Sequence, residues 1–181
     1  MAERRIRQLG DPVLRQVSTP VQDPDLTAAV LQDLRDTLHE FRRTHSFGRG
    51  ISAVQIGITE RIIYMEIDGL SYSLINPVFE YMSDERFALW DDCFSFPDLL
   101  VWLERSENVC IRYTGEQGSD QVLAATGPLS ELIQHEMDHL DGVLAIDRAL
   151  DKNSLCTRDE WQRRHASRRP AAFPRSVAVR D

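Results

Sequence analysis

The sequence predicts an α+β domain, with an N-terminal helix, antiparallel β-sheets and a second helix near the end of the domain. Amphipathic helical patterns flank the middle of the chain, and the middle consists of short segments rich in β-branched and aromatic residues. No helical pattern separates these short segments. Consecutive strands are therefore expected to pair antiparallel, because parallel pairing requires a long crossover connection.

The first predicted helix covers residues 25–43. Asp25 is suited to cap its start, and two glycines, Gly48 and Gly50, follow its end. Apolar side chains recur in it at spacings of three and four, which places them on one helix face. These side chains are Leu26, Val30, Leu31, Leu34, Leu38 and Phe41.

Strands are predicted in the next part of the chain, bounded by residues typical of turns. The predicted strands cover residues 61–67, 72–79, 100–104 and 108–114. The turn residues of this block are Asp68-Gly69, Asn76-Pro77 and Gly115.

A second helix is predicted to begin at Gly127-Pro128, because proline is well suited to the first turn of a helix. Gly142 suits its end. We expect a catalytic domain over residues 1–150 and an arginine-rich tail over residues 151–181. The arginines of this tail are Arg158, Arg163, Arg164, Arg168, Arg169, Arg175 and Arg180.

Composition excludes several classes of protein. Of the 181 residues, 42% are hydrophobic and 28% are charged, which argues against a disordered or collagen-like chain. The net charge of −8 argues against DNA binding. No apolar stretch approaches the roughly 18 residues of a membrane span. No secretory signal is visible and the three cysteines are an odd number, so we expect reduced thiols and a cytoplasmic location.

Inside the second predicted helix, His135-Glu136-Met137-Asp138-His139 has the spacing of a metal site. Histidines at positions i and i+4 share one helix face, so both imidazoles can bind one ion while Glu136 handles the proton of a bound water. A catalytic metal needs a third protein ligand. Ala145 excludes the metzincin pattern, which has histidine there. The residues alone favour Cys93 over Cys110, although a lone cysteine is more often buried packing.

Three segments of the chain together resemble the motifs of the peptide deformylase family. They are residues 48–55 (GRGISAVQ), residues 92–95 (DCFS) and residues 134–140 (QHEMDHL). The corresponding family motifs are G-x-G-φ-A-A-x-Q, E-G-C-L-S and Q-H-E-x-D-H. In the first motif Ser52 replaces an alanine. The resemblance implies the fold of that family, in which the HExxH helix packs in a cleft between the sheets.

The resemblance also implies roles for individual residues. Cys93, His135 and His139 would bind one divalent metal ion, Fe(II) first, with zinc, nickel and cobalt as alternatives. Glu136 would act as general acid and base. An oxyanion site would consist of the Gln55 side-chain amide and the backbone N–H of Phe94, and the backbone of Gly50 would contact an extended substrate.

Several residues depart from the family pattern. Asp91 replaces a glutamate and is expected to pair with Arg105, whereas Asp92 replaces a glycine beside the metal ligand. Arg49 and Glu131 occupy positions that are apolar in the family and line the pocket for the first substrate side chain. Two interpretations stay open. The charged ends reach solvent, or the pocket accepts a polar or charged side chain.

These observations leave three hypotheses for function. The first is a peptide deformylase that hydrolyses the N-formyl amide of new polypeptides and releases formate. The second is a related hydrolase of a non-methionine or small-molecule formamide. The third is a catalytically idle relative that binds peptides. Expected partners are a formylated substrate and, through the arginine-rich tail, the ribosome; no membrane or DNA partner is expected.

Overall fold

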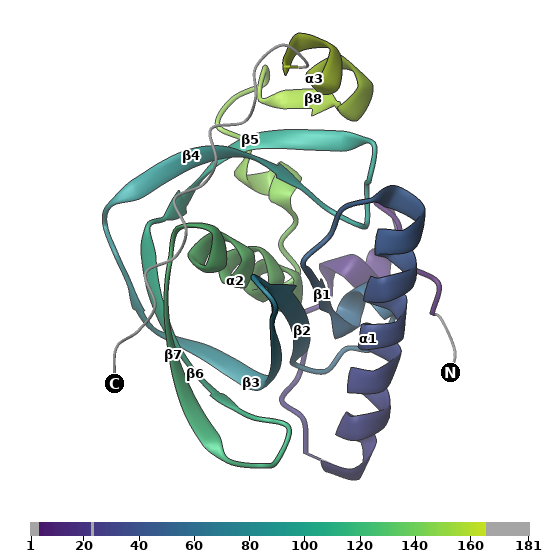
Figure 1. Ribbon diagram of the computed structural model, residues 1–181, viewed down its shortest axis with the longest axis vertical. Coiled ribbons are helices and arrows are strands. Elements are labelled where there is room, and N and C mark those ends of the chain that lie inside the picture. Colours follow the sequence, from purple (N-terminus) through teal and green to yellow (C-terminus); the bar gives the residue numbers. More distant parts are fainter. Residues whose placement is uncertain (1–3, 23, 166–181) are drawn as a thin grey trace.

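The computed structural model describes residues 4–22 and 24–165 (Figure 1). Its helices are α1 (Pro24–His45), α2 (Gly127–Leu140) and α3 (Arg158–His165). Its strands are β1 (Gly50–Ser52), β2 (Ile62–Ile67), β3 (Leu70–Met82), β4 (Arg86–Asp92), β5 (Leu99–Ser106), β6 (Asn108–Thr114), β7 (Asp120–Thr126) and β8 (Leu155–Thr157). These elements confirm the α+β prediction.

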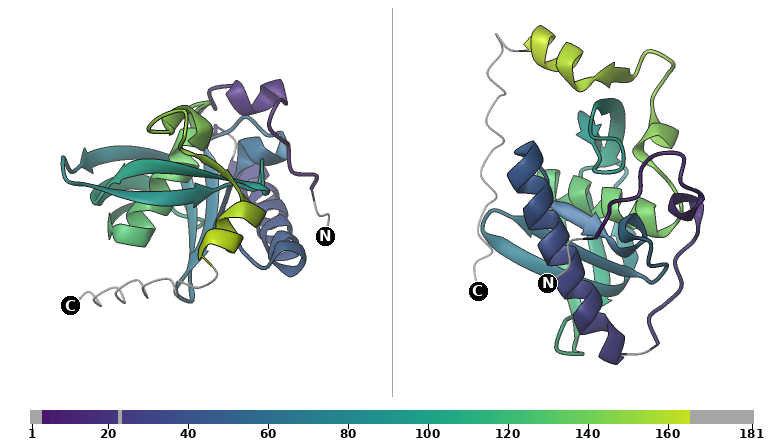
Figure 2. Two further views of the ribbon diagram at one scale, coloured as in Figure 1. Left: turned by 90° about the horizontal axis from the view of Figure 1, so that it is seen from above. Right: turned by 90° about the vertical axis from the view of Figure 1, so that its right-hand side faces the viewer.

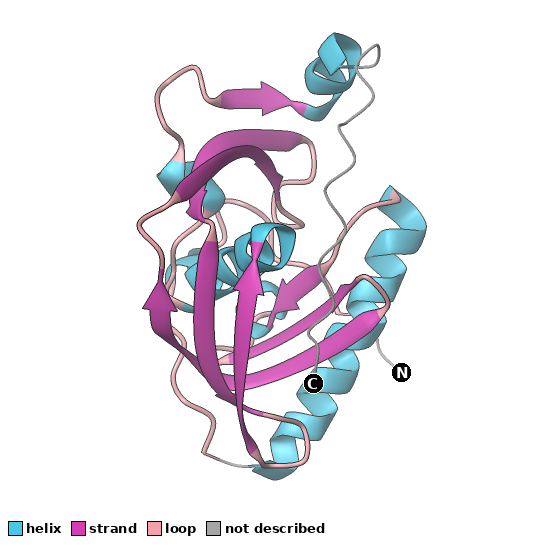
Figure 3. Cartoon of the chain, turned by 60° about the vertical axis from the view of Figure 1, so that its left-hand side comes forward, coloured by secondary structure: helices cyan, strands magenta, loops and turns pink. Residues whose placement is uncertain are grey.

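The strands form two sheets in which all neighbours are antiparallel. The larger sheet has the order β1-β2-β3-β6-β7, and the smaller has the order β4-β5-β8. Helix α2 lies between the sheets and packs against β1, β2, β6 and β7 of one and β5 of the other (Figure 3). The expected position of this helix in the sheet cleft is therefore confirmed.

Helix α1 covers β1 and β2 (Figure 2). It begins one residue before the predicted start, so Asp25 lies in the first turn and not at the cap. Proline at position 24 explains this start, because N–H groups in the first turn have no intrahelical partner and proline therefore loses no hydrogen bond there. Apolar residues of α1 form one core with residues of β1 and β2: Leu31, Leu34 and Leu38 pack with Ile51, Ile62 and Tyr64.

The turn between β2 and β3 is correctly predicted at Asp68-Gly69, where both residues have a positive φ, 53° and 80°. The turn predicted at Asn76-Pro77 is wrong. Asn76 has a φ of 51° but lies at a bulge inside β3, where pairing with β2 has ended and the register against β6 shifts. Hydrogen bonds between the Asn76 side chain and the backbone of Val21 hold this bulge in place.

The β4–β5 hairpin delivers part of the site to α2. Its register runs without a shift from Arg86 opposite Ser106 to Asp92 opposite Leu100. The chain leaves the sheet immediately after Asp92, so Cys93 follows the last paired residue. Sequence patterns predicted β5 but not its partner β4.

The expected tail begins with ordered structure. Strand β8 pairs with β5, and α3 follows it, so residues 155–165 are part of the smaller sheet and its surroundings. The remaining residues of the proposed tail, 166–181, lie outside the described residues. None of the described helices combines the length and the apolar character that crossing a membrane requires.

Candidate metal centre

Helix α2 carries a polar stripe through the interior of the protein. Every residue from Ser130 to Leu140 is buried. Leu132, Ile133 and Met137 pack into the core of the larger sheet, while His135 and His139, one helical turn apart, project from a different face. Buried polar groups need partners, because burial removes their hydrogen bonds to water. The partners of the two histidines therefore define the site.

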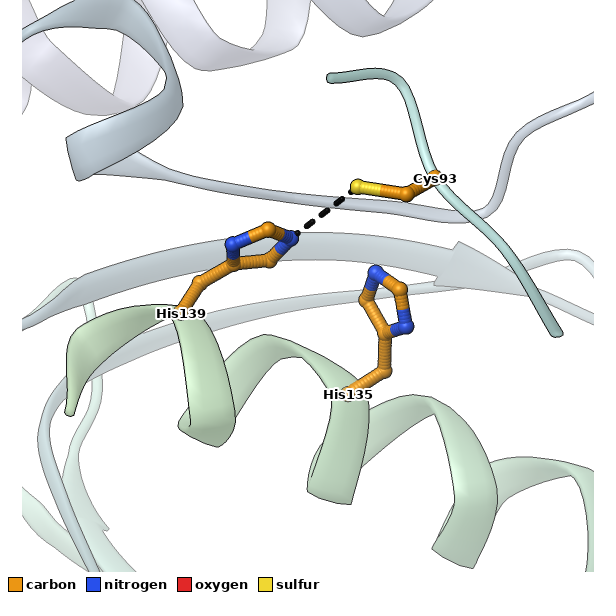
Figure 4. Close-up of side chains that lie close together, drawn as sticks. All are labelled: Cys93, His135 and His139. Carbon is orange, nitrogen blue, oxygen red and sulfur yellow. Dashed lines mark hydrogen bonds between the residues drawn. The ribbon is translucent and has the colours of Figure 1, made fainter. Parts of the chain in front are cut away.

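Cys93 lies opposite the two histidines (Figure 4). Its Sγ is 3.2 Å from Nε2 of His139, and one ligand atom from each of Cys93, His135 and His139 lies within 4.8 Å of the others. In a tetrahedral zinc site, bonds of about 2.3 Å to sulfur and about 2.1 Å to nitrogen separate the two donors by about 3.6 Å. The spacing and chemistry of this group therefore fit one divalent ion.

A buried chain of charged groups orients His135. Its Nδ1 lies 3.0 Å from the Asp91 carboxylate, and Arg105 donates from Nη2 to the same carboxylate at 3.0 Å. Burial raises the pKa of Asp91, but His135 and Arg105 outweigh this and hold that pKa below its usual value. Burial lowers the pKa of His135, but Asp91 outweighs this and raises that pKa well above its usual value. Because Nδ1 is taken by Asp91, Nε2 is the ring atom that is left to bind a metal ion. The expected Asp91–Arg105 pair is confirmed.

His139 has a more isolated environment. Its Nδ1 has no hydrogen-bond partner among the described residues, and burial, reinforced by the nearby His135, lowers its pKa well below the usual value. A neutral imidazole is the form that binds a metal ion. Burial thus keeps His139 ready to act as a ligand.

Glu136 lies beside this group on α2 and is 2% exposed. Burial raises its pKa to about 7, although His135 and a hydrogen bond from Ser52 oppose the shift. The Ser52 hydroxyl donates to Oε2 of Glu136 at 2.6 Å. A carboxylate with a pKa near neutrality is well suited to accept and return a proton. The sequence identified Glu136 but missed its contact with Ser52, for which the departure from alanine was the available signal.

Comparison with known proteins points to one family. The family model described as polypeptide deformylase matches residues 3–154. A peptide deformylase of Bartonella tribocorum is 36% identical over 154 residues, which cover 81% of this chain and 84% of that protein. The crystal structure of peptide deformylase from Thermotoga maritima superimposes with a TM-score of 0.78 at 32% identity, over 83% of this chain and 100% of that one. A Synechococcus elongatus peptide deformylase in complex with actinonin gives 0.77 at 33% identity, over 82% of this chain and 80% of that one.

The chain belongs to the peptide deformylase family. It is a metal-dependent hydrolase of the peptide deformylase type. The comparisons support peptide deformylation over the two alternatives that the sequence left open.

The residues expected at the oxyanion site of this deformylase lie next to Cys93. Gln55 lies on a 3₁₀ turn after β1, where its Oε1 accepts from the backbone N–H of Ser52 at 2.9 Å. That bond orients its amide, so Nε2 lies 3.6 Å from the Cys93 sulfur and 3.3 Å from the Ser95 hydroxyl. Phe94 follows Cys93, and its ring stacks on Phe41 with centroids 3.8 Å apart.

Close packing explains the two glycines of the first motif. A Cβ at Gly50 would lie 2.7 Å from Oε1 of Glu136. A Cβ at Gly48, where φ is 120°, would lie 2.4 Å from the Phe94 ring. Any side chain at either position would displace a residue of the site.

A cavity of about 920 Å³ opens beside the candidate ligands and is lined by the four charged residues that depart from the family pattern: Arg49, Asp91, Asp92 and Glu131. Arg49 donates from Nη2 to Glu131 at 2.6 Å, and their side chains are 40% and 3% exposed. Arg49 therefore reaches solvent as one interpretation expected, whereas Glu131 does not. Burial raises the pKa of Glu131 despite the nearby Arg49. Asp92, whose side chain is 34% exposed, accepts from Nη2 of Arg158 at 2.8 Å.

The other two cysteines and two further histidines lie away from this group. Cys110 is half-buried on β6, and Cys156 is buried on β8; both are free thiols. His39 contacts Glu66 on the outer side of α1, and His45 stacks on Phe41. Of the three cysteines, Cys93 is the one that the fold brings to the histidines.

Proposed function

We propose that Cys93, His135 and His139 hold one divalent ion with which this deformylase hydrolyses the formyl amide at the N-terminus of new polypeptides. One observation carries the proposal: a thiol and two imidazoles converge next to a buried carboxylate. When bound, such an ion acts as a Lewis acid and lowers the pKa of a water molecule. We propose Fe(II) as the native ion, with zinc, nickel or cobalt as functional substitutes, because mixed sulfur and imidazole ligands accept all four.

Glu136 moves the proton in the proposed mechanism. It accepts a proton from the attacking water and later donates it to the nitrogen of the leaving amine, so that formate and a free N-terminus result. The Ser52 hydrogen bond fixes one carboxylate oxygen and leaves the other, Oε1, next to Gly50. Oε1 is therefore the atom that faces the substrate side.

Gln55 and the backbone N–H of Phe94 are proposed to stabilise the oxyanion that forms as water adds to the formyl carbon. The amide of Gln55 is already oriented by its bond to Ser52, so little reorganisation is needed during reaction. A single oriented amide donor of this kind contributes about 3–4 kcal/mol to stabilising the transition state.

The substrate peptide is proposed to run along the backbone of Gly50, with Arg49, Glu131 and Asp92 lining its pocket. Arg49 and Glu131 pair with each other, so the pocket holds no unpaired buried charge that would exclude a methionine side chain. Formylmethionine is accordingly the proposed first residue.

A cytoplasmic location is proposed from the substrate and from the three free thiols. The contact with the ribosome stays a prediction. Arg163 and Arg164 pair with Glu160 in α3, and most of the arginine-rich segment lies outside the described residues.

Formate release from formyl-Met-Ala-Ser by anaerobically purified protein tests the proposal. Glu136→Gln should keep about one bound metal ion per chain and lose activity by about 10²- to 10⁴-fold. Glu160→Gln, which removes an exposed carboxylate of α3, is the matched control and should keep full activity. Undiminished activity of Glu136→Gln would contradict the assigned role.

A further inference from the structure

The segment after residue 150 contributes to the wall of the substrate cavity. Strand β8 adds to the far edge of β5, and α3 begins where that pairing ends (Figure 1). Arg158 and Trp161 of α3 line the same cavity as Cys93 and Glu136. A segment outside the three sequence motifs thus lines the cavity that is proposed to hold the substrate.

Arg158 joins two sides of this cavity. Its Nε donates to the carbonyl oxygen of Pro97 at 2.7 Å, and its Nη2 donates to Asp92 at 2.8 Å. Its guanidinium carbon lies 3.9 Å from the centre of the Phe47 ring, which belongs to the loop between α1 and β1. These contacts hold the guanidinium in place with 20% of the side chain exposed.

The position of Asp92 and Arg158 in the cavity determines which part of a substrate they can contact. Asp92 is adjacent to Cys93 in the sequence, and it is far more exposed than Cys93, so it lies where the cavity opens toward solvent. A polypeptide substrate must leave the cavity through an opening. Each extended residue spans about 3.3 Å, so the residue after the formylated one comes within reach of side chains beside Cys93.

We infer that Asp92 and Arg158 form a charge-compensated subsite for the substrate residue that follows formylmethionine. An aspartate alone at this position, where the family motif has glycine, would favour cationic second residues. Arg158 compensates that charge, which lets the enzyme accept second residues of either sign. The inference deepens the proposed function and rests on it.

Competition between substrates tests this inference. The substrates are formyl-Met-Lys-Ser and formyl-Met-Asp-Ser, and the quantity measured is the ratio of their kcat/KM values for formate release. Both substrates meet the same enzyme preparation, so differences in folding or metal content cancel in the ratio. Arg158→Gln and Asp92→Asn remove one charge each. Arg163→Gln and Glu160→Gln are matched controls, because they remove the same charges from a pair on the exposed side of α3.

The two variants should shift the ratio in opposite directions. Arg158→Gln should raise the preference for lysine by about three- to tenfold, Asp92→Asn should lower it by a similar factor, and the double variant should return to within about twofold of the parent. Sodium chloride at 0.5 M should reduce both shifts. If Arg158→Gln does not fold, the shift of Asp92→Asn toward the aspartate substrate still tests the inference.

Three results would overturn the inference: an unchanged ratio, shifts of the same sign, or equal shifts in the controls. An active parent enzyme with a constant ratio refutes the charged subsite alone. A parent enzyme that releases no formate from any peptide refutes the proposed function, and the subsite with it.

Discussion

The contact between Ser52 and Glu136 leads to a prediction about pH dependence. Both side chains are buried, and the hydroxyl donates to Oε2 of Glu136 at 2.6 Å. A hydrogen bond to a charged group stabilises the protein by about 1.5–3 kcal/mol, and a bond to a neutral group by about half as much. The difference is the free energy by which the hydroxyl favours the ionised carboxylate over the neutral acid. Since one pKa unit corresponds to about 1.4 kcal/mol, Ser52→Ala should raise the pKa of Glu136 by about one unit.

The direction in which the pH profile shifts depends on which form of Glu136 the Ser52 hydroxyl stabilises. Ser52 stabilises the ionised carboxylate, which is the form that accepts a proton from water, so its loss moves the acidic limb of activity to higher pH. At a pH one unit below the midpoint of the parent's acidic limb, kcat/KM of Ser52→Ala should be about tenfold lower than that of the parent at the same pH. On the alkaline plateau it should stay within about twofold, because alanine is the residue of the family motif at this position.

The assay is the pH profile of kcat/KM for formate release from pH 5 to pH 9. Ser130→Ala is the matched control, since it removes a buried hydroxyl from α2 that donates to the Ser106 carbonyl and not to Glu136. The control should leave the acidic limb in place. An unshifted limb in Ser52→Ala, or equal shifts in both variants, would refute the reasoning.

Three more predictions follow from the charged pairs. Asp91→Asn should weaken metal binding by about 10- to 100-fold, measured by competition with a chelator, because His135 loses the carboxylate that orients it. Burial raises the pKa of Glu66, but hydrogen bonds from Tyr64, His39 and Arg42 outweigh it and lower that pKa to about 2. The ionised carboxylate should therefore stabilise the fold above pH 4.5, and this stabilisation should be lost as the pH falls toward 2. In urea unfolding, the free energy of unfolding of Glu66→Gln should not show this decrease with pH. Arg49→Ala should lower the free energy of unfolding by about 1–2 kcal/mol, because Glu131 stays buried without its partner, and replacing both residues by isoleucine should restore it and raise activity on formylmethionine. Equal stability of Arg49→Ala and the parent protein would contradict the last of these.

Local sequence patterns predicted the helix that carries most of the candidate metal centre. Gly127-Pro128 and Gly142 bound α2 as expected, since both ends depend on backbone preferences of single residues. The HExxH spacing places both histidines on one helix face wherever that helix lies. The position of the proposed third ligand depends on the β4–β5 hairpin. The residues alone favoured Cys93 over Cys110 but left the role of Cys93 open until the family motifs supported it.

The missed strands have weak local patterns. Strand β7 contains aspartate, glutamine and two alanines, which are uncommon in strands, and it exists because it pairs with β6 along its full length. Strands β1 and β8 have three residues each, too few for a visible alternation. The Asn76 bulge uses the same left-handed backbone as a turn, so composition could not distinguish the two.

Pairs between distant residues were also beyond local patterns. Asp92 and Arg158 are 66 positions apart, and Arg49 and Glu131 are 82 apart. The sequence showed that Asp92, Arg49 and Glu131 depart from the family motifs, and it placed Arg158 only in the arginine-rich tail. Their compensation in pairs required the fold.

Metal-edge X-ray absorption of anaerobically purified protein tests the central claim most directly, because it reports the atoms bound to the ion. One sulfur at about 2.3 Å and two imidazole nitrogens at about 2.1 Å are predicted, with the sulfur signal lost in Cys93→Ser and retained in Cys110→Ser. An ion bound without sulfur, or a sulfur signal that survives Cys93→Ser, would contradict the assignment of Cys93, His135 and His139 as its ligands.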